Sequence, residues 1–445
     1  MRKDVLKPFQ DKQDFMEERV KYGIESGRKG FGRLHLTDSD NRPAAGAKIT
    51  LRQLNHEFRC GANLFMLDEF SQPEQNQQYK QYFADVFNIA TLPFYWSDLE
   101  PEEGKPRYAK DSPKVYRRPA PDLCLEFCAE HGIEPKAHCL SYANWTPKWV
   151  KSDVASEKRL LAAHFKELAE RYARLIPSWE VTNENFWGEK DYWPNDVPFY
   201  FEPDYVEWGF NTARAFFPGN RLLINEAHRR VWCDDWYFRD RSPYYMLIER
   251  AMLKGAKIDG VGMQYHMFFP ADKEASGTKI YYDPARIYAV LDTYAQLGVP
   301  LQITETTIPA YSNDPADEEI QAEIVRNLYS MWFSHPAMEA VFYWNLIDGF
   351  AYGHPGDMTY GENYYYGGLI RYDFTPKPAY RVIKDLFQKT WRTPEMTIES
   401  RADGECEFRG FYGEYAAEIV YNGKMEKRII KLSKNTKARF DLKLS

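Results

Sequence analysis

The sequence of 445 residues has no long hydrophobic run and no excess of basic residues, and both absences exclude classes of protein. No stretch approaches the roughly 18 consecutive apolar residues of a transmembrane helix, and the mean hydropathy is −0.62. The 58 Lys and Arg against 65 Asp and Glu give a net charge of −7, which disfavours binding to a nucleic-acid backbone. We therefore expect neither a membrane nor a nucleic acid as a partner.

The chain is also poor in cysteine. Its six cysteines are scattered, and only Cys124 and Cys128 lie four residues apart, with no second pair at zinc-site spacing. We expect free, mostly buried thiols. The opening MRKDVLKPFQDKQDF has basic residues but lacks the apolar segment of a signal peptide. These features favour the cytoplasm, although a secreted chain trimmed of its signal would look the same. The sequence does not decide the oligomeric state.

Aromatic residues, in contrast, are abundant at 16% of the chain. Most of them are expected to pack in a core. Because flat aromatic faces also stack on the apolar faces of sugar rings, this composition makes a carbohydrate ligand worth considering.

Short apolar runs alternate with segments of helical periodicity along most of the chain. There are eight such runs: EFRCGANLF, FNIATLPFYW, IEPKAHCL, SWEVTNE, RLLINEAH, IDGVGMQYHMF, LQITETTI and MEAVFYWNLI. The clearest helix covers 157–176, with Leu161, Phe165, Leu168, Tyr172 and Leu175 along one stripe. Eight strand–helix units predict an α/β fold, a parallel sheet closed as a (β/α)8 TIM barrel. The alternative, an open doubly wound sheet for a nucleotide, lacks a glycine-rich turn after the first run.

The two ends of the chain do not fit this pattern. Residues 30–55 are typical of two alternating strands around a turn, and residues 395–445 predict further strands with an Asn422-Gly423 hairpin turn. We expect an N-terminal extension over residues 1–57, a catalytic barrel over 58–393 and C-terminal strands over 394–445. Because neither end forms a convincing core alone, we expect the two to pack together as one small β-module.

A carboxylate closes two of the apolar runs. Glu184 ends the fourth run in 178-SWEVTNENFWGE-189, and Glu305 ends the seventh in 301-LQITETTIP-309. Since the carboxyl ends of barrel strands meet at one mouth, we expect the two side chains to face each other. Two facing carboxyls suit glycoside hydrolysis, where one donates a proton and the other is ionised. The alternative is that each merely pairs with a nearby Arg or Lys.

The motifs around these carboxylates resemble those of glycoside hydrolase family 10, the xylanases of a large clan of retaining β-glycosidases. WEVTNE is similar to the family's Trp-Asp-Val-Val-Asn-Glu motif, and ITETTI to its Ile-Thr-Glu-Leu-Asp-Ile nucleophile strand. Five further segments match in order: AHCLSYANWTPKW, LLINE, GVGMQYH, YWNLID and TPKPAY. The resemblance covers roughly residues 58–390.

The resemblance implies a role for each matching residue. Glu184 would be the general acid/base and Glu305 the nucleophile of a retaining reaction that needs no cofactor and no metal, on a xylan-like or other β-linked oligosaccharide or polysaccharide. Asn183 would hydrogen-bond the sugar 2-hydroxyl, and His266 would orient Glu305. The other implied substrate-binding residues are His138, Gln264, Trp344, Tyr95 and Tyr352. Retention implies carboxyls about 5–5.5 Å apart, against roughly 6.5–9.5 Å for inversion.

The sequence departs from the family where the sugar is recognised. Leu92 and Tyr95 stand where the family's second strand has an Asn and a Lys that hold the sugar beyond the cleavage site. Further along, Tyr142 and Ala143 replace a Trp and a His, Thr307 replaces an Asp, and Tyr352 replaces a Trp. Losing a cation and an amide removes directed hydrogen bonds to sugar hydroxyls, and such bonds set specificity. The substrate is therefore expected to differ from unsubstituted xylan.

Other reactive residues support competing chemistry only weakly. His138, His228 and His266 might suggest a metal-dependent hydrolase, but the first run offers no His-x-His pair. Cys60 and Cys139 near strands are more often small buried hydrophobic residues than nucleophiles.

Two aromatic stretches follow predicted strands and can be interpreted in two ways. In 186–203, Trp187, Tyr192 or Trp193 would wall a sugar site or simply pack within the loop, and 350–368 has the same ambiguity. Besides an active hydrolase, the sequence allows a carbohydrate-binding pseudo-enzyme on the same barrel. A structural or interaction protein using the terminal β-module has no further support.

Overall fold

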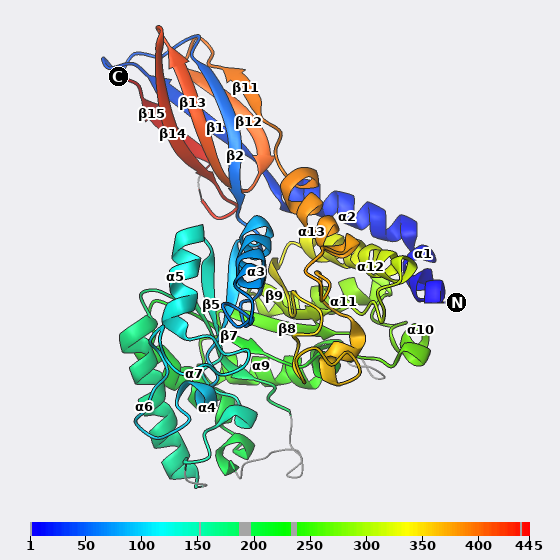
Figure 1. The fold of residues 1–445 in the computed structure, drawn as a ribbon. Coiled ribbons are helices and arrows are strands. Elements are labelled where there is room, and N and C mark those ends of the chain that lie inside the picture. Colours follow the sequence, from blue (N-terminus) through cyan, green and yellow to red (C-terminus); the bar gives the residue numbers. More distant parts are fainter. Residues whose placement is uncertain (1, 151–152, 187–196, 233–237, 437) are drawn as a thin grey trace.

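The computed structural model describes residues 2–150, 153–186, 197–232, 238–436 and 438–445. Figure 1 shows two bodies, a barrel surrounded by helices and a β-sandwich standing on one end of it. None of the helices within these ranges has both the length and the apolar character needed to cross a membrane.

Eight parallel strands close into a barrel in the order β10-β3-β4-β5-β6-β7-β8-β9. Their bounds are β3 (Arg59–Asn63), β4 (Ile89–Pro93), β5 (Glu134–His138), β6 (Ser178–Asn183), β7 (Arg221–Asn225), β8 (Gly260–His266), β9 (Leu301–Thr307) and β10 (Met338–Tyr343). Each strand coincides with one of the eight predicted apolar runs. The closed order confirms the predicted (β/α)8 barrel and excludes the open doubly wound sheet.

Helices follow the strands and form the outer layer of the barrel (Figure 1). They are α3 (Pro73–Val86), α4 (Trp96–Leu99), α5 (Pro121–His131), α6 (Val154–Tyr172), α7 (Tyr205–Phe216), α8 (His228–Trp232), α9 (Pro243–Leu253), α10 (Glu274–Gly277), α11 (Pro284–Tyr294), α12 (Pro315–Ser334) and α13 (Pro378–Asp385). Short helical turns are η2 (Ala143–Trp145), η4 (Pro198–Phe201), η5 (Arg239–Arg241), η6 (Ala271–Lys273), η7 (Ala295–Leu297), η8 (Gly361–Tyr365) and η9 (Leu386–Thr390).

Local sequence signals explain where several of these helices begin and end. Asp153, Asp283 and Asp314 each cap a helix by accepting a hydrogen bond from a backbone N–H of its first turn. Gly132 ends α5 in the left-handed conformation, with φ of 64°. The expectation that Leu175 lies on the buried stripe of its helix is wrong: α6 ends at Tyr172, and Leu175 is 57% exposed.

The two ends of the chain form one β-sandwich. One sheet has the order β12-β1-β15 and the other the order β11-β2-β13-β14. The strands are β1 (Lys29–Thr37), β2 (Lys48–His56), β11 (Met396–Glu399), β12 (Glu405–Phe411), β13 (Gly413–Tyr421), β14 (Lys424–Leu432) and β15 (Arg439–Lys443). Asn422 and Gly423 form the β13–β14 turn with φ of 49° and 77°, as a two-residue hairpin requires. This confirms a β-module built from both ends, while its exact limits stay a prediction.

The module has its own core. Its inner residues include Leu34 and Leu36 of β1, Ile49 and Leu51 of β2, and Ile419 of β13, all of them buried. N-terminal residues therefore supply one strand to each sheet, and the C-terminal residues supply the others.

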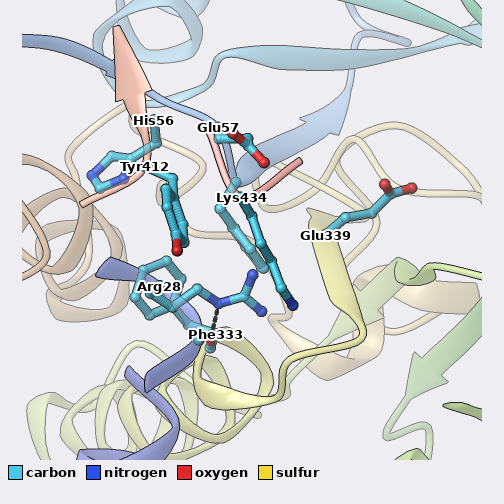
Figure 2. A pocket seen from close by; sticks show the side chains of 9 residues that line it. Arg28, His56, Glu57, Phe333, Glu339, Tyr412 and Lys434 are labelled. Carbon is cyan, nitrogen blue, oxygen red and sulfur yellow. Dashed lines mark hydrogen bonds between the residues drawn. The ribbon is translucent and has the colours of Figure 1, made fainter. Parts of the chain in front are cut away.

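The module joins the barrel at the amino-terminal ends of the strands, away from the mouth. A cavity of about 50 Å³ lies at this joint, lined from the barrel by Phe58, Phe333 and Glu339 and from the module by Tyr412 and Lys434 (Figure 2). Arg28 reaches into it and donates hydrogen bonds to the carbonyl oxygens of Phe333, His335 and Met338.

The chain before β1 is helical, in η1 (Arg2–Leu6), α1 (Lys7–Gln10) and α2 (Gln13–Gly27), and α2 packs against α12. Gly23 permits that close approach, because a Cβ there would collide with the carbonyl oxygen of Ser334.

Candidate active site

The two predicted carboxyls lie at the carboxyl ends of the fourth and seventh barrel strands. Glu305 belongs to β9, and Glu184 directly follows β6. Glu184 has a φ of 51°, a left-handed conformation that is costly for a residue with a side chain. Two hydrogen bonds hold it there: the Glu184 N–H donates to Asn225 O at 3.2 Å, and the Asn185 N–H donates to Glu226 Oε2 at 2.6 Å.

One amide group bridges the two carboxyls. Gln264 Nε2 donates to Glu184 Oε1 at 3.0 Å and to Glu305 Oε1 at 3.2 Å. The two oxygens therefore cannot be farther apart than the sum of these distances, 6.2 Å. The same nitrogen also lies 3.4 Å from Asn183 Oδ1, so Asn183, Glu184, Gln264 and Glu305 form one connected group.

Glu305 is surrounded by further hydrogen-bond partners. Asn225 Nδ2 donates to its Oε1 at 2.9 Å, and His266 Nε2 lies 3.1 Å from its Oε2. The other ring nitrogen of His266 lies 3.1 Å from Thr307 Oγ1, which fixes the ring. The hydroxyl of Thr307 thus occupies the place of the aspartate expected from the family pattern.

Glu184 has a different environment. Burial raises the pKa of Glu184 above its ordinary value, and the nearby Glu305 carboxylate adds to that rise. A hydrogen bond from Tyr142 Oη to Glu184 Oε2, at 2.6 Å, and the one from Gln264 act in the opposite direction. Since its pKa is raised, Glu184 is suited to hold a proton for donation.

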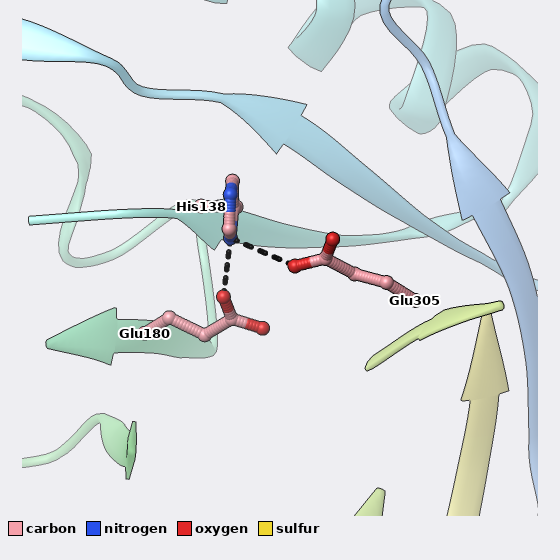
Figure 3. A group of neighbouring side chains, drawn as sticks. All are labelled: His138, Glu180 and Glu305. Carbon is pink, nitrogen blue, oxygen red and sulfur yellow. Dashed lines mark hydrogen bonds and ion pairs between the residues drawn. The ribbon is translucent and has the colours of Figure 1, made fainter. Parts of the chain in front are cut away.

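A buried network of charged side chains lies next to the Glu305 carboxyl group. His138 Nδ1 lies 4.0 Å from Glu305 Oε1 and hydrogen-bonds Glu180 (Figure 3). The other carboxylate oxygen of Glu180 pairs with Lys136. Lys136 and Glu180 are fully buried. Burial opposes ionisation of Glu180, yet the charges of Lys136 and His138 hold its pKa at about 2.

His138, Glu180 and Glu305 have residue types and spacing that could hold a metal ion. However, the Lys136 ammonium is paired with Glu180, and a metal there would repel it. The group is therefore better described as an ion-pair network.

His228, another histidine considered from the sequence, lies in α8, and burial lowers the pKa of His228 to about 3. Cys60 and Cys139 are free and buried, and burial raises the pKa of both thiols, which makes them poor nucleophiles.

Aromatic side chains form one wall of the site. Phe65, Tyr95 and Trp344 make a buried cluster, with Tyr142 and Trp145 packed against it. The His138 ring lies 5.2 Å from the Tyr95 ring and 5.7 Å from the Trp344 ring. The predicted sugar-contacting residues Tyr95 and Trp344 thus lie next to the carboxyl pair.

Tyr352 does not join this group. It is 60% exposed, and its backbone exchanges hydrogen bonds with Glu362 in the loop after β10. The predicted wall residues Trp187, Tyr192 and Trp193 lie outside the described residues.

Two arginines and one glutamate at this site were not predicted from the sequence. The Arg118 guanidinium stacks 4.0 Å from the Tyr95 ring centre and 4.6 Å from that of Trp145, and its Nε donates to Asp98 at 2.8 Å. Arg117 is buried and donates to Asn345 Oδ1 at 2.9 Å. Both arginines lie in the loop before α5 and place two cations beside the aromatic wall of the site.

The overlooked glutamate is Glu226, which follows β7 and accepts backbone hydrogen bonds from Ala227 and Asn185. Burial raises the pKa of Glu226 to about 8. Through Asn185 it anchors the strained turn that carries Glu184. The sequence signal for Glu226 was the glutamate within the fifth apolar run, RLLINEAH.

A closed eight-stranded barrel with two carboxyls facing each other at its catalytic mouth defines a glycoside hydrolase-type protein. The chain belongs to glycosyl hydrolase family 10, since the model of that family matches residues 65–386.

Among curated relatives, the anti-sigma-I factor RsgI6 of Acetivibrio thermocellus is 24% identical, over 90% of this chain and 46% of its own length. Endo-1,4-beta-xylanase 2 of Arabidopsis thaliana is 24% identical, over 87% of this chain and 32% of its own length. Endo-1,4-beta-xylanase B of Thermotoga neapolitana is 23% identical over 75% of this chain and 88% of its length. The chain thus spans less than half of the first two relatives.

Among solved structures, native xylanase 10B of Thermotoga maritima superimposes with a TM-score of 0.58 at 21% identity, covering 75% of this chain and 96% of that one. At this identity the likeness establishes the fold alone.

Proposed function

We propose that the protein is a retaining glycoside hydrolase that cleaves xylan-like, β-linked oligosaccharides by double displacement. Glu305 is the nucleophile and Glu184 the general acid/base. The observation that carries the proposal is the shared contact with Gln264, which limits the gap between the two Oε1 atoms to 6.2 Å. A bound of 6.2 Å on this oxygen pair supports the roughly 5–5.5 Å separation of the carboxyl groups in retaining enzymes over the roughly 6.5–9.5 Å of inverting ones.

In the first step, Glu305 attacks the anomeric carbon while Glu184 gives its proton to the leaving oxygen. His266 and Asn225 hold the Glu305 carboxylate during the attack. In the second step, ionised Glu184 takes a proton from water, and the resulting hydroxide releases the sugar from Glu305. Asn183, whose Oδ1 lies 3.4 Å from Gln264 Nε2, would contact the sugar 2-hydroxyl, as the family resemblance implies.

The substrate class rests on the relatives, several of which are named endo-1,4-beta-xylanases. Trp344, whose ring packs beside the rings of His138 and His266, offers a flat face to a sugar ring. The second-strand positions Leu92 and Tyr95 lack the expected amide and cation, so the sugar beyond the cleavage site is recognised differently. We therefore propose an oligosaccharide related to, but not identical with, unsubstituted xylan.

Glu184→Ala and Glu305→Ala, assayed on aryl β-xylosides and xylo-oligosaccharides, test the proposal. Loss of the acid/base should slow cleavage of a poor leaving group by about 10²–10⁴-fold. Azide should restore some of the activity in Glu184→Ala and give a β-glycosyl azide, the signature of retention. Glu407→Gln on the module surface is the control and should behave as wild type. If both active-site variants kept wild-type turnover, the assignment would be wrong.

A carbohydrate-binding pseudo-enzyme is the second candidate. One observation favours a protein without turnover: a relative that matches 90% of this chain is named as a factor, the anti-sigma-I factor RsgI6, and not as an enzyme. Glycan binding by calorimetry, with no product released from a broad panel after long incubation, would support this candidate over the hydrolase.

A further inference from the structure

Tyr142 follows β5 and points its hydroxyl at the acid/base carboxyl. It donates a hydrogen bond of 2.6 Å to Glu184 Oε2. Its ring packs beside Tyr95, with ring centres 6.3 Å apart, in the aromatic cluster of Phe65, Tyr95 and Trp344. Because these neighbours are buried, the hydroxyl is held on Glu184 by packing as well as by the hydrogen bond.

The two oxygens of Glu184 have different partners. Oε1 shares Gln264 Nε2 with Glu305 and so faces the gap in which a glycosidic bond would lie. Oε2 faces Tyr142, on the other side of the carboxyl. We propose that Tyr142 is a positioning residue: its hydroxyl holds Oε2 of Glu184 as an acceptor, so that Oε1, which accepts from Gln264 on one lone pair, carries the proton on the other into the gap.

This inference rests on the proposed function and adds a direction to its proton transfers. As the C1–O bond breaks, its electron pair goes to the leaving oxygen, which takes the proton from Glu184 Oε1, while Glu305 bonds C1. In the second step Oε1 takes a proton from the attacking water, and the C1–Glu305 bond breaks. Tyr142 keeps its own proton throughout, since burial and the adjacent Glu184 carboxyl raise the pKa of Tyr142 well above its ordinary value.

The charge balance around Glu184 gives the sign of the expected effect. Besides burial, the titratable groups that shift the pKa of Glu184 are Tyr142, Glu305 and His266. Glu226 and Cys139 also lie near, and Glu184 contributes to the raised pKa of each. Glu305 raises the pKa of Glu184, whereas His266 lowers it, and the Tyr142 hydrogen bond lowers it most. Removing the hydroxyl should therefore make Glu184 hold its proton to higher pH.

Tyr142→Phe tests the proposal through the pH profile of kcat/KM on an aryl β-xyloside with a poor leaving group. The alkaline limb, which reports loss of the Glu184 proton, should move up by about one pH unit, the size of shift expected from one hydrogen bond to a carboxylate. Tyr205→Phe is the matched control. It removes another buried hydroxyl, bonded to the neighbouring Ser141 at 3.1 Å, and should leave the limb in place.

Packing alone would predict a lower rate with an unshifted limb, so an alkaline limb within about 0.2 pH units of wild type overturns the proposal. Failure of the proposed function looks different, because the wild type itself would then release no product. In that case ¹³C-glutamate NMR difference spectra against Glu184→Gln still report the Glu184 titration with and without Tyr142. An unchanged Glu184 midpoint in Tyr142→Phe would overturn the proposal there as well.

Discussion

Replacing Lys136 by Met should destabilise the barrel strongly. Lys136 and Glu180 are both fully buried, and the Lys136 ammonium also lies 4.1 Å from the centre of the Phe342 ring. Methionine has a similar length and fills the same space without the charge. The substitution therefore removes the cation while leaving the Glu180 carboxylate in the interior with His138 as its remaining partner.

The expected cost follows from that uncompensated charge. Breaking a buried ion pair by removing one member typically costs about 3–5 kcal/mol. Because His138 still hydrogen-bonds Glu180, we expect the lower end, about 3 kcal/mol. At an unfolding entropy of about 2.1 cal/mol/K per residue, a chain of 445 residues loses about 1 °C per kcal/mol, so the melting temperature should fall by about 3 °C.

The loss should also depend on pH. The pKa of Glu180 is about 2 in the folded protein, below the value of about 4.3 in an unfolded chain. The wild-type pair therefore stabilises the fold fully above about pH 4.3 and less as the pH falls toward 2. The difference between wild type and Lys136→Met should be full at pH 6 and smaller at pH 3.5.

Urea unfolding followed by tryptophan fluorescence at the two pH values measures this difference. The double variant Lys136→Met/Glu180→Gln removes both charges and should recover much of the stability. A single-variant loss below about 1 kcal/mol at pH 6, or one that grows at pH 3.5, would refute the reasoning.

Two further predictions concern Arg118 at the aromatic wall of the site and the terminal β-module. Arg118→Met removes the cation stacked on Tyr95 and Trp145, and it should raise KM for xylo-oligosaccharides about tenfold, or about 1.4 kcal/mol, while kcat on an aryl β-xyloside stays unchanged. Equal effects on both substrates would mean that Arg118 only supports the fold. Deleting residues 395–445 takes the pairing partners from β1 and β2 and exposes Leu34 and Ile49, so soluble yield should fall sharply. Unchanged solubility and melting would contradict the shared module.

The barrel could be predicted because each of its strands is a short apolar run separated by a periodic helix. Where periodicity is weak, no helix was predicted. Residues 2–27 are helical, yet α2 buries only Met16 and Gly27 fully, so its sequence has no continuous apolar stripe. Leu175 continued the spacing of α6 but lies beyond its last turn, because spacing alone does not locate a helix end.

The residues of the site likewise divide into those that could be predicted from the sequence and those that could not. Glu184, Glu305, Asn183 and Gln264 stand at strand ends in recognisable motifs, and the structure brings them together. Arg117 and Arg118 come from an irregular loop, which carries no periodic signal and reaches the site only through tertiary packing. Lys136 and Glu180 were visible as charges within buried strands, but their pairing depends on the adjacency of β5 and β6.

The distribution of hydrogen bonds explains why two glutamates at one mouth would take opposite roles. Glu305 accepts hydrogen bonds from Asn225 and Gln264 on one oxygen and lies beside His266 on the other, so its carboxyl group is held in one orientation. Glu184 is buried, and both this burial and the nearby Glu305 carboxylate oppose its ionisation. The hydrogen bonds from Tyr142 and Gln264 and the charge of His266 act against them. A carboxyl balanced in this way can release a proton in one step and accept one in the next, as the proposed function requires of Glu184.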